Sequence, residues 1–116
     1  MDIKVREAHP GVHVLDIDGR LDLHTIHIFK DEVEPLKEDG DLILNFRDVA
    51  AVDSSALGVL IRLSMDYEER KRRLVMVELS DLVLHVFELC GLTHRFPIYK
   101  TEGEGLSFLT DRDAAG

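Results

Sequence analysis

The sequence has few cysteine, tryptophan and basic residues, and this scarcity argues against several classes of protein. Of its 116 residues one, Cys90, is cysteine and none is tryptophan, while 14 lysines and arginines face 23 aspartates and glutamates. A single cysteine cannot form a disulfide within the chain, so nothing indicates an oxidising compartment. The formal net charge of −9 argues against nucleic acid as the main partner, because such affinity comes largely from lysine and arginine on phosphates. A basic protein surface fits this charge better than an anionic membrane does.

Long apolar segments are absent as well. The longest stretch free of charged residues and histidine, 54–61, contains a glycine and begins with two serines, and no run approaches the roughly 20 residues of a membrane-spanning helix. The first residues alternate in polarity and lack the basic stretch and apolar core of a signal peptide. We therefore expect a cytoplasmic protein with no direct membrane insertion. Ordinary globular composition and the absence of a low-complexity linker predict a single domain over residues 1–116.

The apolar residues follow strand patterns in five places. These segments are 3–5, 12–17, 42–46, 74–77 and 97–99. Alternation in the first two, with Pro10 and Gly11 between them, predicts an antiparallel hairpin. The continuous apolar runs at 42–46 and 74–77 are typical of strands covered on both faces. Residues 47–52 are expected to form a connector.

Helical spacing recurs in four segments between and after these strands. They are 26–36, 56–67, 82–90 and 104–111, and residues 114–116 are expected to fray. Thr25 is a candidate cap for the first helix, and Pro35 should weaken its last turn. In the third helix, Leu82 and Cys90 fall on the predicted buried face. The alternation predicts an α/β fold, with a small mixed sheet of four to five strands, parallel in its centre, covered by four helices.

The predicted start of the second helix also carries side chains that could be chemically functional. Asp53, Ser54 and Ser55 stand at the predicted start of the second helix. Backbone N–H groups in a first helical turn lack internal partners, and side-chain oxygens of aspartate or serine can accept their hydrogen bonds. The helix dipole favours negative charge there, so a phosphate on a serine would be well placed. On its own the pattern indicates a plain helix cap.

The wider sequence resembles a known family. Residues 52–58 read Val-Asp-Ser-Ser-Ala-Leu-Gly, similar to the hallmark of the STAS family and of bacterial anti-sigma factor antagonists in particular. Three further segments resemble that family in order and spacing: 19–22, 42–46 and 87–92. The resemblance covers nearly the whole chain. It implies a STAS-like fold and a regulatory binding module, with no enzymatic activity and no cofactor.

The resemblance also implies roles for individual residues. Ser55 would be the phosphoacceptor of an anti-sigma factor serine kinase. The unmodified protein would bind that kinase and release a sigma factor, and a phosphoserine phosphatase would restore it. Asp53 would cap the helix, and would orient Ser55 or contact the kinase, while Ser54 would be structural. Gly58 either lets a partner approach closely or serves helix packing. Asp22 either lies near the site or is an exposed turn carboxylate.

Two features of the chain qualify the match. Ala56 replaces the commoner glycine of the hallmark, which stiffens the turn; with Leu57 it is expected to support the switch or the partner surface. The basic run 70–73 lacks the glycine that the family often has before the fourth strand.

Alternatives remain open at this point. A STAS-like protein can also be a scaffold subunit of a stress-signalling complex or an accessory subunit of a lipid transporter, with Ser55 only a cap. His24 and His27 have a spacing that two metal ligands can share, but no third ligand is evident. No phosphate-binding glycine loop and no hydrolase serine elbow is present. The chain therefore resembles a kinase substrate more than an enzyme.

Overall fold

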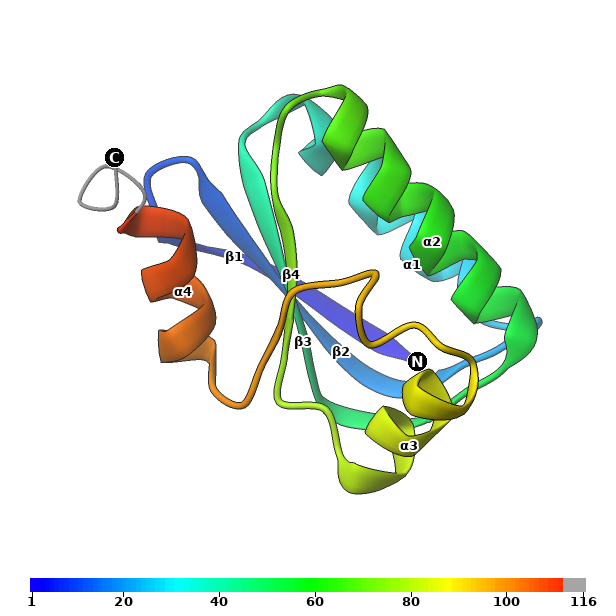
Figure 1. Ribbon diagram of the computed structural model, residues 1–116. Helices are drawn as coiled ribbons and strands as arrows, with labels where there is room; N and C mark the ends of the chain where they lie inside the picture. Colours follow the sequence, from blue (N-terminus) through cyan, green and yellow to red (C-terminus); the bar gives the residue numbers. More distant parts are fainter. Residues whose placement is uncertain (112–116) are drawn as a thin grey trace.

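Five strands form one mixed sheet in the order in which they occur along the chain (Figure 1). They are β1 (Asp2–His9), β2 (Val12–Leu21), β3 (Asp41–Val52), β4 (Leu74–Val77) and β5 (Ile98–Tyr99). Strand β1 is antiparallel to β2, and the other neighbours are parallel. The computed structural model describes residues 1–111. The predicted frayed end, 114–116, lies outside the described residues.

The helices lie on both faces of this sheet. They are α1 (Ile26–Val33), the 3₁₀ helix η1 (Glu34–Glu38), α2 (Ser54–Glu69), α3 (Asp81–Leu89) and α4 (Glu102–Thr110). Each parallel strand is added at the same edge, so right-handed crossovers place α1, α2 and α3 on one face. Helix α4 follows the last strand and covers the opposite face (Figure 1). Within residues 1–111, no helix has both the length and the apolar character to cross a membrane.

Two apolar clusters, one on each face, hold the layers together. The larger lies beneath α1, α2 and α3. Within it the rings of Phe46 and Phe87 pack edge to face, with their centroids 6.4 Å apart. The smaller lies beneath α4 and includes Ile43 and Val75. Residues 41–46 of β3 are therefore all buried. This confirms the interpretation of the apolar run as a central strand, and the structure confirms the predicted α/β class.

Residues 47–52 are strand and not the predicted connector. They continue β3, and the register pairs Asp18 with Asp48 and Leu21 with Val52. The long β2 offers ladder partners along its whole length, so β3 extends beyond its apolar part. The sequence pattern missed this because Arg47 and Asp48 are exposed and interrupt the apolar run.

Fewer side chains of helix α3 are buried than its apolar pattern predicted. Only Val83 and Phe87 are buried, whereas Leu82 is 64% exposed and Cys90 is exposed. The prediction that Leu82 and Cys90 face the core is wrong, because so short a helix presents only one narrow stripe to the sheet. Pro35 acts as predicted: α1 ends at Val33, and the chain continues as the tighter helix η1.

The turn before β4 keeps a left-handed residue although the run 70–73 has no glycine. Lys71 adopts φ 58°, a left-handed conformation that glycine adopts more readily than residues with a side chain. A lysine therefore holds this turn, and β4 begins three residues later at Leu74.

Candidate functional site at the start of helix α2

The site is assembled where β2 and β3 end side by side. In the parallel register Leu21 pairs with Val52, and the Asp53 N–H then donates to the Leu21 carbonyl at 3.1 Å. The loop that follows β2 and the helix start that follows β3 therefore leave the sheet together. This geometry brings Asp22 and Asp53, 31 positions apart in sequence, to the same edge.

Asp53 is the N-cap of α2 and the centre of the site. Its Oδ1 accepts the Ser55 hydroxyl at 2.6 Å and the Ala56 N–H at 3.0 Å, and its Oδ2 accepts the Leu23 N–H at 3.0 Å. The Ser55 hydroxyl, followed by the Ala56 N–H, lowers the pKa of the Asp53 carboxyl, because these donors stabilise the ionised form. Asp53 is thus a charged acceptor that links the helix start to the β2–α1 loop.

The other residues of the hallmark divide into accessible and buried groups. Ser54 is exposed and Ser55 is half-buried. Ala56 and Leu57 are buried, with 0% and 7% of their surface exposed, so their side chains pack in the core beneath α2. Of the two serine hydroxyls, only that of Ser55 hydrogen-bonds to Asp53.

Gly58 is exposed one turn into α2. A Cβ built at this position meets nothing within 4 Å. Nothing in residues 1–111 therefore requires a glycine here, and the alternative of simple helix packing has no contact to support it. A glycine inside a helix costs about 0.5–1 kcal/mol relative to alanine.

Asp22 organises the loop between β2 and α1. Its Oδ1 accepts the backbone N–H groups of His24 at 2.9 Å and Thr25 at 3.2 Å. Thr25 holds the N-cap position of α1 but makes no side-chain capping bond; its hydroxyl donates to the Arg20 carbonyl at 2.5 Å. Asp22 is half-buried, and its carboxylate caps the loop that follows it.

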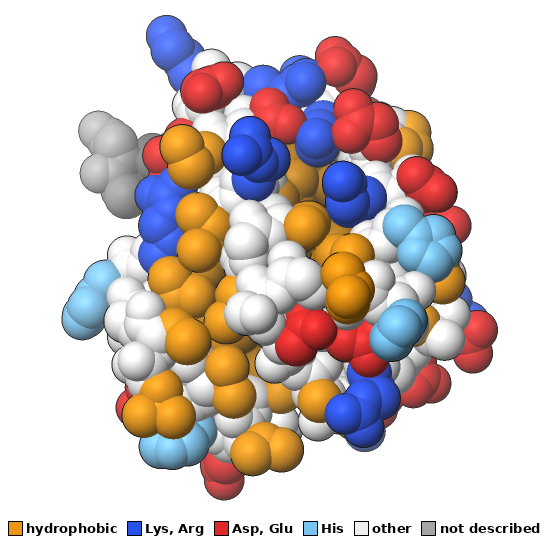
Figure 2. Space-filling view, turned by 90° about the vertical axis from the view of Figure 1, so that its right-hand side faces the viewer, with side chains coloured by type: hydrophobic (Ala, Val, Ile, Leu, Met, Phe, Trp, Pro, Cys, Tyr) orange, Lys and Arg blue, Asp and Glu red, His pale blue; other side chains and the backbone are white. Residues whose placement is uncertain are grey.

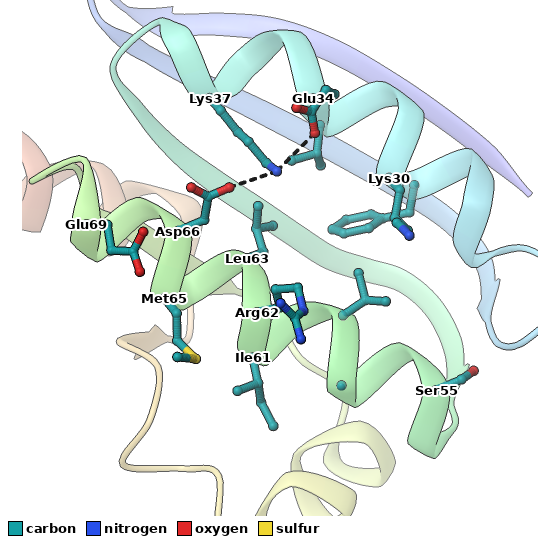
Figure 3. A pocket seen from close by; sticks show the side chains of 14 residues that line it. Lys30, Glu34, Lys37, Ser55, Ile61, Arg62, Leu63, Met65, Asp66 and Glu69 are labelled. Carbon is teal, nitrogen blue, oxygen red and sulfur yellow. Dashed lines mark ion pairs between the residues drawn. The ribbon is translucent and has the colours of Figure 1, made fainter.

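A groove of about 650 Å³ runs between α1 and α2 (Figure 3). Ser55 and Gly58 line it together with apolar side chains that include Phe29 and Leu63. Farther along α2, Lys37 of η1 forms an ion pair with Asp66, with its Nζ 2.8 Å from the carboxylate. Ser55 thus belongs both to the helix start and to a concave surface.

The helical face around this groove carries both apolar and charged side chains. Figure 2 shows that hydrophobic side chains gather toward the left and lower parts of this face, and charged ones toward the top and right. Large apolar residues exposed on α2 and α3 are Met65, Leu82 and Leu89.

The structure adds no third ligand to the histidine pair. His24 precedes α1 and His27 lies within it, and both are exposed. Among residues 1–111, no group of three or more histidine, cysteine, aspartate or glutamate side chains is arranged to hold a metal ion.

Comparison with known proteins identifies the family. The STAS domain family matches residues 4–105, and the chain belongs to it. The anti-sigma-B factor antagonist of Listeria monocytogenes is 29% identical over 106 residues, which cover 90% of this chain and 93% of that protein.

Solved structures agree on the fold. The anti-sigma factor antagonist SpoIIAA in its unphosphorylated form superposes with a TM-score of 0.76 at 21% identity, covering 99% of this chain and 98% of the other. The Bacillus cell fate determinant SpoIIAA in its phosphorylated form gives 0.70 at 20% identity, covering 91% and 97%. The mixed five-stranded sheet with its four α-helices is thus the STAS fold.

The sequence did not indicate one participant in the site. The backbone of Leu23 is bound by Asp53, although the two are 30 residues apart. No pattern in the sequence marks that contact, since it depends on the register between β2 and β3.

Proposed function

We propose that this protein is an anti-sigma factor antagonist controlled by phosphorylation of Ser55. The unphosphorylated form binds an anti-sigma factor serine kinase and so releases a sigma factor. Phosphorylation ends that binding, and a phosphoserine phosphatase restores it. The observation that carries the proposal is the Ser55 hydroxyl at the first turn of α2, 2.6 Å from the Asp53 carboxylate and on a residue that lines the groove. The chain acts as the substrate and has no catalytic role.

The phosphoryl transfer needs only groups that the kinase and its nucleotide supply. The γ-phosphorus of ATP forms a bond to Ser55 Oγ while its bond to the β–γ bridging oxygen breaks, and ADP leaves. The hydroxyl proton passes to a base on the kinase. Asp53 has a lowered pKa and is therefore a weak base. Its part is to orient the hydroxyl, which makes it a positioning residue.

Ser55 suits this role better than Ser54. Its hydroxyl is oriented by Asp53, and the residue is one of those that line the groove. A phosphate adds a charge of about −1.5 to −2 at pH 7, and it would stand beside the Asp53 carboxylate. The N–H groups of the first helical turn offset part of this repulsion, so the domain tolerates the phosphate while the partner surface changes. A loss of about 3 kcal/mol in binding would weaken the complex more than a hundredfold.

Gly58 supports a binding surface next to Ser55. It is exposed and nothing lies within 4 Å of the position that a Cβ would take. No contact within the chain therefore compensates for the helix stability that a glycine loses relative to alanine. We assign this open space to the backbone or a side chain of the partner. Asp22, which shares the edge of the sheet with Asp53, belongs to the same surface.

Phosphorylation in the test tube separates this proposal from a plain helix cap. The purified chain is incubated with ATP, Mg²⁺ and each serine-kinase anti-sigma factor of its source organism, and the phosphate is located by mass spectrometry. The expected result is one phosphate, on Ser55, that is lost in Ser55→Ala and kept in Ser54→Ala. Calorimetry should then show tight binding of the unmodified chain and at least a hundredfold weaker binding of the phosphorylated form. A chain that remains unmodified, or that binds equally well in both forms, contradicts the proposal.

A further inference from the structure

Leu23 is a large apolar residue held out into solvent beside the switch. Its surface is 69% exposed, although it follows directly after the half-buried Asp22. Single exposed leucines are common on protein surfaces and need no explanation by themselves. This one differs from the others because its backbone N–H is bound by the carboxylate that also binds the Ser55 hydroxyl.

The loop that carries Leu23 is fixed on both sides. Asp22 Oδ1 accepts the N–H groups of His24 and Thr25, and Thr25 Oγ1 accepts the Asp22 N–H at 3.1 Å. The Leu23 N–H itself donates to Asp53 Oδ2 at 3.0 Å. Because this backbone is already fixed, a partner that covers Leu23 has little loop backbone left to order.

The surroundings of Leu23 have the layout of a binding hot spot. Interfaces commonly place a buried apolar anchor inside a polar rim. At Leu23 the polar groups are the Asp53 carboxylate and the Ser55 hydroxyl, which hydrogen bonds join to the Leu23 N–H in one network. The Asp22 carboxylate binds the next two N–H groups of the same loop. The exposed leucines of α3, Leu82 and Leu89, have no hydrogen bond to this network.

We infer that Leu23 is an apolar anchor of the partner interface and that Asp53 couples its position to the state of Ser55. The partner would offer an apolar pocket for the leucine side chain, bordered by donors that meet the two carboxylates. This inference rests on the proposed function and names the chemistry of the partner at that same site.

The coupling follows from what phosphorylation does to Asp53. The phosphoryl group replaces the hydroxyl hydrogen, so Ser55 Oγ no longer donates to Oδ1. Its added charge then repels the carboxylate. As the carboxylate moves away, Oδ2 leaves the Leu23 N–H, and the anchor loses its fixed position. One modification thus adds repulsion at Ser55 and loosens an apolar contact in the neighbouring loop.

Binding measurements test the anchor. Leu23→Ala should weaken the affinity for the anti-sigma factor kinase by about tenfold or more, since the burial of a leucine is lost. Leu89→Ala is the matched control, because Leu89 is 73% exposed but lies outside the network; its affinity should stay within about threefold of wild type. Wild-type affinity in Leu23→Ala, or an equal loss in Leu89→Ala, overturns the anchor.

Hydrogen exchange of the Leu23 amide tests the coupling without any partner. In Asp53→Ala, in Ser55→Glu and in the enzymatically phosphorylated chain, that amide should exchange at least about tenfold faster than in wild type. The Thr25 amide, bonded to Asp22, should keep its rate. Unchanged exchange of Leu23 in Ser55→Glu and in the phosphorylated chain rejects the coupling while leaving the switch intact. Failure of every kinase to modify Ser55 rejects the proposed function, and the effect of Asp53→Ala is still measurable.

Discussion

The hydroxyl of Ser55 and the carboxylate of Asp53 form a hydrogen bond of 2.6 Å at the start of α2. This bond is the largest cause of the lowered pKa of Asp53, and the Ala56 N–H adds to it. The residue proposed to receive the phosphate thus also stabilises the charge of its helix cap. Modification of Ser55 therefore reaches the cap directly.

The first prediction concerns this carboxyl group. The pKa of Asp53 should lie below the ordinary value of about 4 in wild type and rise toward it in Ser55→Ala, because the donor is lost. A carboxyl with a depressed pKa in the folded state stabilises the protein above its unfolded pKa, and that stability is lost as the pH falls through the folded pKa. NMR titration of the Asp53 carboxyl carbon measures the shift. Ser54→Ala is the control, and an equal shift in both variants would contradict the assignment.

Gly58 allows a prediction in which stability and binding move in opposite directions. Gly58→Ala should raise the free energy of unfolding by about 0.5–1 kcal/mol, because alanine is the better helix former and its Cβ meets nothing within the chain. The same methyl group should weaken the proposed binding to an anti-sigma factor kinase, because it would occupy the space that we assign to the partner. Chemical denaturation and calorimetry measure the two effects. Unchanged binding would show that the space at Gly58 is unused.

The elements that a local pattern determines were predictable from the sequence. The apolar runs at 42–46 and 74–77 are buried strands, and Asp53 caps α2 as the residue type at that position suggests. Cap and strand signals depend on neighbours in the chain, which the sequence displays directly. Ser55 was placed correctly at the helix start for the same reason.

Features that depend on pairing between distant segments were not predictable. The extension of β3 through residues 47–52 relies on ladder partners in β2, and the bond between Leu23 and Asp53 relies on the same register. The exposure of Cys90 depends on how much of α3 the sheet can cover. In each case the feature depends on which distant segments pack together, and the sequence does not show this directly.

The contact between α4 and the sheet yields a third prediction. A Cβ at Gly105 would lie 2.7 Å from Cγ1 of Val77, closer than packed atoms allow, and 3.2 Å from Cγ1 of Val75, which is a tight contact. Gly105→Ala should therefore lower the free energy of unfolding by about 1–3 kcal/mol. Gly103→Ala, in the same helix, is the control. Its Cβ would meet only Thr101 Oγ1, at 3.9 Å, so it should be neutral or stabilise by up to about 1 kcal/mol. Equal effects in thermal unfolding would contradict the close packing of α4.

A fourth prediction concerns the ion pairs that join the two ends of the described chain. The Arg6 guanidinium on β1 binds Asp16, with Nε 2.6 Å from Oδ2, and Glu102 at the start of α4, with Nη1 2.9 Å from Oε2. The Glu102 carboxylate also accepts from Asn45 Nδ2 at 3.1 Å. Arg6, and after it Asn45, lowers the pKa of Glu102 against the opposing effect of burial.

Glu102→Gln should lower the free energy of unfolding at pH 7 by about 0.5–1 kcal/mol, because the pair is partly exposed and screened by solvent. The depressed pKa fixes the pH dependence. The contribution is complete above the ordinary glutamate pKa of about 4.3 and disappears as the pH falls through the lower folded value, since protonated Glu102 no longer pairs with Arg6. Urea denaturation of wild type and variant from pH 7 to pH 3 should therefore show two stability curves that converge at the acid end. Glu104→Gln removes the same charge from the same helical turn without touching Arg6. Its curve should stay closer to wild type at pH 7, and a loss as large as that of Glu102→Gln would assign the effect to the helix dipole instead of the ion pair.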